Sequence, residues 1–290
     1  MKIKTVDGLE LYAHREGVGE RTIMLLNGVG VSTFFWKYLR TYFNHRYQMI
    51  IWDYRGHGRS DQPKEIASFR FHHLLEDLST IFQFFKLEQA ILIGHSMGAA
   101  LALDYASKFP RRVSAIVSVL GSYEHMLSEL FHFRHSGTVF QILNAVNRQF
   151  PGKFNSIWRH LGKLPINYAM AKLTVVNGDF CKKEDMDSYF KHLSSMNFDF
   201  FMKALSECQK HSSRKKLSRI KCPTLIIGGD KDNFTPIRKS FEMYELIRGA
   251  ELMVIPNGSH AAVVEQPEII CLRIEKFLRE NEERRLKERR

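Results

Sequence analysis

The sequence contains few cysteines and no long hydrophobic run. Its four cysteines, in 290 residues, include no C-x-x-C pair, and so few thiols do not make a disulfide framework. No stretch approaches the roughly 18 consecutive apolar residues of a membrane-spanning helix. The first residues carry lysines but no apolar segment after them, so we expect no cleaved signal peptide. These absences predict a cytoplasmic protein with reduced thiols and no integral membrane segment.

Acidic residues are scarce relative to basic ones, 31 against 43, which leaves a formal net charge of +12. Such an excess raises nucleic acid, an anionic membrane surface or an acidic substrate as partners. The chain has no helix-turn-helix, zinc or RNP motif, so we expect no nucleic-acid partner. Residues 122–221 carry 16 basic and 8 acidic residues, and therefore hold most of the excess.

The rest of the composition is that of a globular protein, with 44% hydrophobic and 26% charged residues. At about 150 residues per domain, the length allows one large domain or one domain with an insertion. Short apolar runs alternate with helical patterns such as Phe71–Lys86, which predicts parallel strands covered by helices on both faces. The runs that read as these strands are Thr22–Leu26, Gln48–Trp52, Ala90–Ile93, Val113–Leu120, Pro223–Gly228 and Glu251–Ile255.

Residues 122–213 interrupt this alternation. They contain no strand-like run bounded by turns, and their helical patterns are broken by Gly and Pro. Of these 92 residues 14 are aromatic, an enrichment that suggests a pocket with apolar walls. We therefore expect an α/β core formed by residues 1–121 and 214–290, with a helical insertion at 122–213 directly after the run Val113–Leu120.

The sequence Gly94-His95-Ser96-Met97-Gly98 lies between a predicted buried strand and the apolar helical stretch Ala99–Tyr105. A G-x-S-x-G sequence between a strand and a helix is typical of a nucleophile elbow. The turn is sharp, so the residues that flank the serine must be small. The helix N-terminus that follows favours a developing negative charge. We therefore interpret Ser96 as a nucleophile rather than as a helix cap.

A serine hydroxyl becomes a good nucleophile only when a nearby base takes its proton. In chains with this elbow, the partners follow in the order serine, acid, histidine. His260 lies in the loop after the predicted strand Glu251–Ile255, on the edge of the sheet where Ser96 is exposed. His260 is therefore the predicted base among the 13 histidines.

The acid that orients the base is expected in the loop after the strand Thr224–Ile227, which contains Asp230 and Asp232. A carboxylate in this position holds the tautomer of the histidine. Asp53 and Glu124 also follow strand ends and are weaker candidates. The residues alone leave Asp230 and Asp232 as alternatives.

At these motifs the chain resembles the α/β-hydrolase superfamily, in its branch of cap-bearing serine esterase-like enzymes. The resemblance extends over nearly all of the chain except the insertion, and it is specific for the fold but weak for the substrate. The matching segments are Leu25-Leu26-Asn27-Gly28, Asp53-Tyr54-Arg55-Gly56-His57-Gly58-Arg59-Ser60-Asp61, Gly94-His95-Ser96-Met97-Gly98, Gly229-Asp230-Lys231-Asp232 with Thr235-Pro236, and Gly258-Ser259-His260.

The resemblance implies a role for each site residue. Ser96 would attack a carbonyl carbon, His260 would transfer the proton, and Asp232 would orient His260. The backbone N–H groups of Val29 and Met97 would form the oxyanion hole. The family's spacing favours Asp232 over its neighbour in the loop. The family also has a helical cap after its sixth strand, which is where the insertion lies. The loop from Asp53 to Asp61 would be structural, held by Asp53 and Arg55.

One position departs from the family's pattern, since Asn27-Gly28 stands where His-Gly is usual. The expected oxyanion donor is a backbone group, so the hole should survive, although Asn27 changes how the loop is hydrogen-bonded. A serine at the elbow argues against the epoxide hydrolases and haloalkane dehalogenases, which resemble this chain but have an aspartate there.

Together these features predict a carboxylesterase or lipase-like hydrolase that acts on small esters with an apolar acyl chain. The alternatives with the same three residues are a lactonase, a thioesterase, a C–C bond hydrolase and an acyltransferase. A small-ligand receptor without enzymatic activity is a further alternative. The basic insertion would steer anionic esters or bind an anionic interface peripherally, or it is only a solvated helical face. The oligomeric state is not readable from the sequence.

We expect neither a cofactor nor a metal ion, because a catalytic serine needs none. His125, His132 and His135 follow one another at helical spacing, but neither a carboxylate nor a cysteine completes a metal site there.

Overall fold

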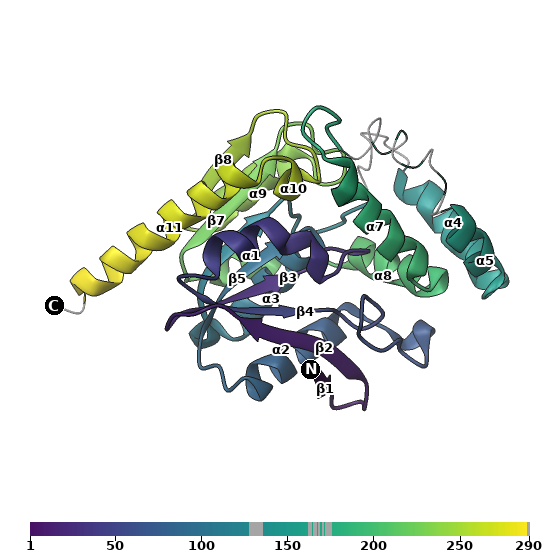
Figure 1. The fold of residues 1–290 in the computed structure, drawn as a ribbon, viewed down its shortest axis with the longest axis horizontal. Coiled ribbons are helices and arrows are strands. Elements are labelled where there is room, and N and C mark those ends of the chain that lie inside the picture. The colour runs from purple at the N-terminus through teal and green to yellow at the C-terminus, as the bar shows by residue number, and fades with distance from the viewer. Residues whose placement is uncertain are drawn as a thin grey trace.

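A computed structural model describes residues 1–127, 136–161, 164, 167, 169, 171 and 176–288. Its centre is an eight-stranded sheet with the order β1-β2-β4-β3-β5-β6-β7-β8 (Figure 1). The strands are β1 (Lys2–Lys4), β2 (Glu10–Glu16), β3 (Thr22–Leu26), β4 (Gln48–Trp52), β5 (Ala90–His95), β6 (Val113–Val119), β7 (Thr224–Gly229) and β8 (Glu251–Ile255). The predicted α/β fold with a mostly parallel sheet is confirmed.

Strands β3 to β8 pair in parallel, and β1 and β2 add an antiparallel edge. The central strands β3 and β5 are buried along their whole length, as expected for apolar runs covered on both faces. In the register of the sheet, Leu26 pairs with Gly94 and His95 pairs with Val119. The carboxyl ends of β3, β5 and β6 therefore lie side by side, where the loops that follow them meet.

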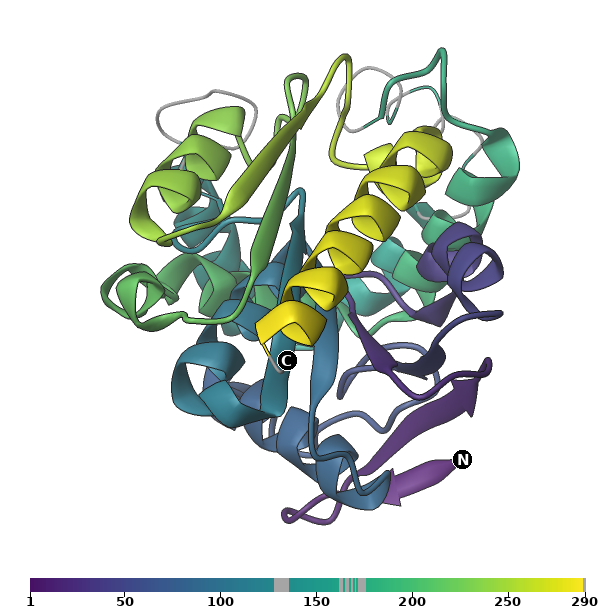
Figure 2. The same cartoon turned by 90° about the vertical axis from the view of Figure 1, so that its left-hand side faces the viewer.

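Helices cover both faces of the sheet, and each face has its own buried apolar cluster. One cluster packs against α1 and α11, and the other against α2, α3 and α9. Figure 2 shows helices on both sides of the sheet. The helices of this core are α1 (Lys37–Phe43), α2 (Phe71–Phe84), α3 (Met97–Lys108), α9 (Ile237–Leu246), α10 (Ala262–Glu265) and α11 (Pro267–Glu288), and the short 3₁₀ turns are η1 (Thr33–Trp36), η2 (Ile66–Ser68), η3 (Pro110–Arg112) and η5 (Arg214–Arg219).

The apolar pattern of the sequence predicts a closing helix over Val264–Leu278, followed by a charged stretch that is a solvated helix end or a frayed tail. The structure differs in the bounds of this helix. It is divided into α10 and α11 because Pro267 cannot donate the hydrogen bond that would continue α10, and it begins a new helix instead. Helix α11 also continues into the charged tail. There Glu282 pairs with Arg21, and Arg284 lies 3.7 Å from Glu251.

Between β6 and β7 the described chain is helical, with α4 (Ser136–Gln149), α5 (Lys153–Leu161), α7 (Lys183–Ser195) and α8 (Phe198–Lys210). These helices lie together beyond one end of the sheet (Figure 1). An isolated bridge pairs Glu124 with Ser212, so the two ends of the segment meet. Next to it the Ser213 hydroxyl donates to the buried carboxylate of Asp104 in α3, at 2.6 Å. The segment thus leaves and rejoins the core at one place.

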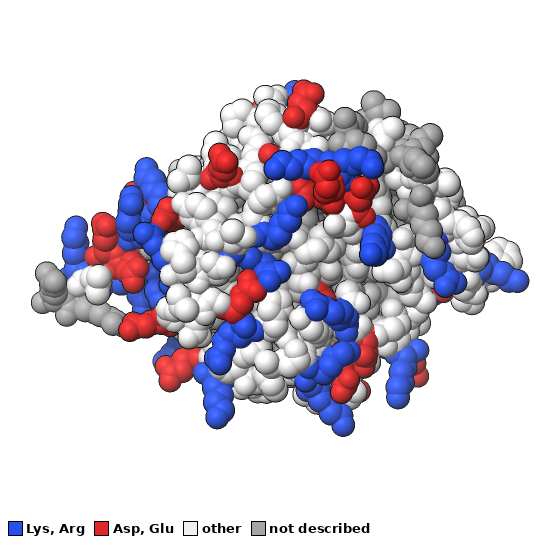
Figure 3. Space-filling view, viewed as in Figure 1, with Lys and Arg blue, Asp and Glu red and all other residues white. Residues whose placement is uncertain are grey.

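Three properties of the described residues bear on the expectations above. None of the helices within them is both long and apolar enough to cross a bilayer. The four cysteines are free thiols. On the face shown in Figure 3, basic and acidic side chains lie interspersed over most of the surface.

Candidate active site

Ser96 occupies the turn between β5 and α3 with φ = 53° and ψ = −118°. A positive φ is costly for a residue other than glycine, and it is maintained only where the surroundings enforce it. A Cβ added to Gly98 would lie 2.1 Å from the backbone oxygen of Leu26, and one added to Gly94 would lie 2.3 Å from that of Gly98. The two glycines are therefore required for β3, β5 and α3 to approach this closely, as the elbow motif predicts.

The loops after β7 and β8 bring two side chains to Ser96. The Nε2 atom of His260 lies 3.1 Å from Ser96 Oγ, and its Nδ1 atom lies 2.9 Å from Asp232 Oδ2. A carboxylate can only accept, so Nδ1–H donates to Asp232 and Nε2 is left to accept from the hydroxyl. Phe234 stacks on the imidazole ring, with 5.0 Å between the ring centroids. The hydroxyl, imidazole and carboxylate form one continuous hydrogen-bonded chain.

Asp232 is only 2% exposed. Its carboxylate accepts from the N–H groups of Phe234 and Thr235, both at 2.8 Å, and from the Thr235 hydroxyl at 2.7 Å. Burial by itself would raise the pKa of Asp232, but the charge of His260 and these hydrogen bonds outweigh it and lower the pKa. Asp230 is exposed. Of the two acids that the sequence left open, the structure brings Asp232 to His260.

The two weaker candidates serve other contacts. Asp53 is buried and accepts from the N–H groups of Thr33 and Arg59, both at 3.0 Å. Glu124 accepts from Lys239 at 3.3 Å. Neither carboxylate lines the cavity that contains Ser96.

The loop after β3, which contains Val29, is held by side chains on both sides. Asn27 is buried, donates to the carbonyl of Trp52 at 2.8 Å and accepts from the indole N–H of Trp36 at 2.7 Å. The N–H of Gly30 donates to Nε2 of His57 at 3.1 Å. Asn27 thus fixes the start of the loop through hydrogen bonds to Trp36 and Trp52.

The N–H groups of Val29 and Met97 are the predicted oxyanion donors. Neither donates to a backbone or side-chain acceptor elsewhere in the described ranges. Met97 is the first residue of α3, where a backbone N–H has no partner within its own helix. Val29 itself lines the cavity that contains Ser96.

His95 supports the site although no role was predicted for it. Its ring is 2% exposed, and its Nε2–H donates to the carbonyl of His260 at 2.9 Å. Its ring also lies 4.6 Å from that of Phe35 and 4.8 Å from that of His260, centroid to centroid. Burial, and then the charge of His260, lowers the pKa of His95 to about 3. His95 therefore stays neutral and braces the backbone that carries His260.

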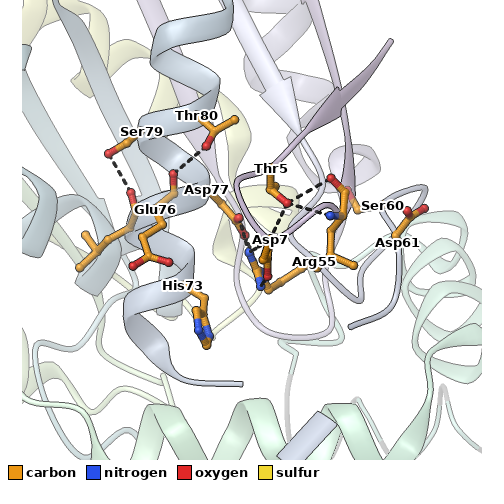
Figure 4. A network of polar contacts seen from close by, with 12 residues as sticks. Thr5, Asp7, Arg55, Ser60, Asp61, His73, Glu76, Asp77, Ser79 and Thr80 are labelled. Atoms are coloured by element: carbon orange, nitrogen blue, oxygen red, sulfur yellow. Dashed lines mark hydrogen bonds and ion pairs between the residues drawn. The ribbon is translucent and has the colours of Figure 1, made fainter. Parts of the chain in front are cut away.

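Arg55 anchors the loop from Asp53 to Asp61, to which it belongs, to residues outside the loop (Figure 4). The guanidinium donates to both carboxylate oxygens of Asp77, at 2.7 and 2.5 Å, and to Asp7 at 2.8 Å. The hydroxyl of Thr5 donates to the same Asp7 carboxylate at 2.6 Å. Arg55 and Asp77 are both buried, and Asp7 is half exposed. This geometry agrees with the structural role expected for the loop.

His57 and His192 stack on each other across the boundary between the core and the segment that links β6 to β7. Their ring centroids lie 6.3 Å apart. Burial lowers the pKa of His57 to about 4. Burial, and then the charge of His57, lowers the pKa of His192 to about 3. Both rings are therefore neutral at pH 7.

These buried histidines predict that the protein loses stability in mild acid. The folded-state pKa values lie below the unfolded value of about 6.5, so the stabilisation is present above that pH and is lost as the pH falls. Each such histidine lowers the free energy of unfolding by about 2 kcal/mol between pH 7 and pH 5. Between pH 7 and pH 5, we expect the free energy of unfolding of His192→Leu to fall by about 2 kcal/mol less than that of the wild type. Urea unfolding at both pH values measures the difference.

The matched control is His45→Gln, which removes an exposed histidine and should leave the pH dependence unchanged. Equal losses of stability in wild type and His192→Leu would contradict the prediction.

A cavity of about 340 Å³ opens onto Ser96 and His260. The core and the segment between β6 and β7 both contribute apolar walls, and Cys208 of α8 is the cysteine that lines it. Lys37 of α1 and Asp185 of α7 form an ion pair at its edge, and the Tyr38 hydroxyl donates to Asp185 at 3.1 Å. The aromatic residues of the wall are Phe34, Phe35, Phe140, Tyr189, Phe201 and Phe234.

Metal-ligand geometry occurs in the described chain at one cluster, His72, His73 and Glu76 on α2. None of the three lines the cavity at Ser96. Of the histidines noted at helical spacing, His132 and His135 lie outside the described residues. His125 is described, and its ring contacts the carbonyl of Gln209 at 3.0 Å.

Comparisons with known proteins agree with this architecture. Residues 21–267 match the family described as alpha/beta hydrolase fold. The chain is 24% identical over 260 residues to the human protein ABHD8, covering 88% of this chain and 54% of that protein. It is 26% identical over 260 residues to the mouse serine hydrolase BPHL, covering 88% and 78%. The chain thus spans about half the length of the human relative.

A solved structure gives the same result for the fold. The enol-lactonase from Burkholderia xenovorans superposes with a TM-score of 0.79 at 18% identity, covering 96% of this chain and 99% of that one. At this identity the likeness concerns the arrangement of strands and helices.

Proposed function

Since this chain belongs to the alpha/beta hydrolase fold family, we propose that it is a serine hydrolase that cleaves carboxylic esters through an acyl-enzyme. The observation that carries the proposal is the position of His260 between Ser96 and Asp232, at 3.1 and 2.9 Å. These are the distances at which a base can take the serine proton while a carboxylate holds its tautomer.

In the first step, Ser96 Oγ attacks the ester carbonyl carbon, and its proton passes to Nε2 of His260. Asp232 stays ionised and stabilises the imidazolium that forms, in accord with its lowered pKa. The carbonyl oxygen becomes an oxyanion that accepts from the N–H groups of Val29 and Met97. His260 then returns the proton to the departing alkoxide, and the acyl group remains on Ser96.

The second step releases the acid. A water molecule takes the place of the alcohol and gives its proton to His260 as it attacks the acyl carbon. The resulting oxyanion forms in the same place, and as it collapses the bond to Ser96 Oγ breaks and His260 returns the proton to that oxygen. The proposed steps use no metal or cofactor, because His260 performs the proton transfers and the backbone N–H groups stabilise the oxyanion by hydrogen bonds.

The proposed substrate has a small or medium apolar acyl chain, and we propose that residues 122–213 form the cap that covers it. The cavity volume, about 340 Å³, lies at the lower end of the range for small-molecule sites. Its walls are mainly aromatic and aliphatic, so apolar groups gain free energy on entering it. The mouse serine hydrolase and the bacterial enol-lactonase both support acyl chemistry at such a site.

A series of p-nitrophenyl esters tests the proposal. Each methylene that enters an apolar pocket contributes about 0.8 kcal/mol, which is about a fourfold gain in kcat/KM. We therefore expect kcat/KM to rise with each added carbon until the cavity is full, and then to fall. Initial rates across the series measure both the activity and the depth of the pocket.

The variant Leu205→Trp enlarges a residue in the wall of the cavity. It should move the maximum of kcat/KM to shorter acyl chains. No hydrolysis of any ester, with no labelling by a fluorophosphonate, would favour the receptor alternative instead.

A further inference from the structure

A second cavity, of about 380 Å³, lies between the start of α2, the end of α4 and the outer side of α8. Ser96, Asp232 and His260 do not line it. We call it the basic cleft. The polar residues that line it are Arg70, Asn144, Asn147, Arg148, Asp199, Lys203, Ser206 and Lys210.

Positive charge is concentrated in the basic cleft. The carboxylate of Asp199 is the acidic group on its wall, and it accepts from the N–H of Gly152 at 2.8 Å, while its second oxygen has no partner among the described residues. Lys203 is paired with Glu207 at 2.5 Å. Four cations thus face two carboxylates, and the cleft keeps an excess of positive charge.

Three of the four cations are free to contact a ligand. Arg70, Arg148 and Lys210 are exposed, and none has a carboxylate partner within the described ranges. Arg70 Nη1 donates to the carbonyls of Ala67 and Phe69, at 2.7 and 2.8 Å. These two bonds fix the Arg70 guanidinium at the edge of the cleft and leave its other N–H groups available.

The positive charges of the cleft affect the pKa of Lys203, which lies among them. Burial lowers the pKa of Lys203, and the positive charges of Arg70 and Lys210 lower it further, although Glu207 acts in the opposite direction. Cations that repel one another at a shared site gain stability when an anion joins them. The mutual repulsion of Arg70, Lys203 and Lys210 therefore favours the binding of an anion in the cleft.

A neutral group in the cleft also lacks a partner. Asn147 is 5% exposed, and its side-chain oxygen has no hydrogen-bond partner among the described residues. A buried amide without its hydrogen bonds is costly. Its oxygen and nitrogen can exchange places by rotation of the amide, so Asn147 can accept from a ligand hydroxyl or donate to a ligand oxygen.

We propose that the basic cleft binds a small molecule that carries a phosphate group. Arginine and lysine together neutralise a phosphate dianion, and the guanidinium fork matches its oxygens. The cleft is larger than a phosphate alone, so Asn147 and Ser206 are left to bond the rest of the molecule. This site also gives the basic residues of the insertion a partner apart from the proposed substrate.

Calorimetric titration of the full chain with inorganic pyrophosphate and with orthophosphate tests the proposal. We expect saturable binding of one anion per chain, weakened by added salt. The double variant Arg148→Gln/Lys210→Gln should weaken binding at least about tenfold, because charge-assisted hydrogen bonds are lost. A thermal melt establishes that the variant is folded, and Arg148→Lys should retain part of the affinity.

The matched control is Lys153→Gln/Arg159→Gln, which removes the same charge from exposed positions of α5 that do not line the cleft. It should change the affinity by less than about twofold, since surface charges act only weakly at a distance. Equal weakening by both double variants, or no saturable binding by the wild type, would overturn the proposal.

Cosedimentation with phosphatidylcholine vesicles that contain phosphatidic acid separates a soluble ligand from a lipid headgroup. If pyrophosphate displaces the protein from vesicles, and Arg148→Gln/Lys210→Gln binds neither pyrophosphate nor vesicles, one phosphate site accepts both soluble phosphates and lipid headgroups. That result would support the proposal. Binding to vesicles without binding to either soluble anion would overturn the assignment to a small molecule.

Discussion

Ser96→Ala is expected to lower kcat/KM for p-nitrophenyl esters by about 10⁴- to 10⁶-fold, the loss that follows when a serine nucleophile is removed. The substitution deletes only Oγ, and an alanine has the same Cβ in the same positive-φ turn, so the backbone strain at the elbow does not change. The variant should therefore fold like the wild type. Rates, far-UV circular dichroism and the melting temperature measure the two effects separately.

Ser118→Ala is the matched control, because Ser118 is a buried serine in β6 whose hydroxyl has no partner among the described residues. It should keep its activity and its covalent labelling by a fluorophosphonate, whereas Ser96→Ala should lose both. Ester hydrolysis that persists in Ser96→Ala would rule out this serine as the nucleophile.

Arg55→Ala is expected to lower the free energy of unfolding by about 3–5 kcal/mol, because it leaves a buried carboxylate without its cation. Asp77 is 1% exposed, and its two oxygens accept from Arg55 at 2.7 and 2.5 Å. Water cannot replace the guanidinium without a rearrangement of the loop that carries it. Urea unfolding at pH 7 measures the loss.

Two further variants separate the buried charge from the other contacts of Arg55. Asp7→Asn changes the half-exposed partner and should cost less than about 1 kcal/mol. Arg55→Met combined with Asp77→Leu removes both buried charges and should recover most of the stability. A double variant no more stable than Arg55→Ala would show that the loss came from packing instead of the unpaired carboxylate.

The parallel strands of the fold were predictable from the sequence because each is a short apolar run that ends in a turn. The edge strand β1 was not predicted, since its three residues Lys2–Lys4 alternate charged with apolar side chains over too short a length. The end of the closing helix was predictable only in part. Its charged residues indicate a solvated helix end or a frayed tail; the structure has the helix continuing through them, and pairs such as Arg21 with Glu282 join it to the core.

In the candidate site, the positions of Ser96 and His260 followed from motifs and loop order, which are local properties of the chain. The roles of His95 and His57 did not, because they depend on contacts with residues far away in the sequence. His95 bonds the carbonyl of His260, 165 positions later, and His57 accepts from Gly30, 27 positions earlier. Both histidines lie within the sequence motifs, but the motifs do not predict which residues their rings contact.

The turn at Ser96 also separates the shape of the site from its chemistry. Its backbone conformation depends on the absence of side chains at Gly94 and Gly98 and on the close approach of β3, and not on the hydroxyl of Ser96. Position 96 can therefore hold another side chain without a change of the backbone, whereas positions 94 and 98 can hold only glycine. A single codon change there would exchange the hydroxyl for a thiol or a carboxylate on an unaltered scaffold, which gives evolution, or a protein engineer, a short route from one reaction to another.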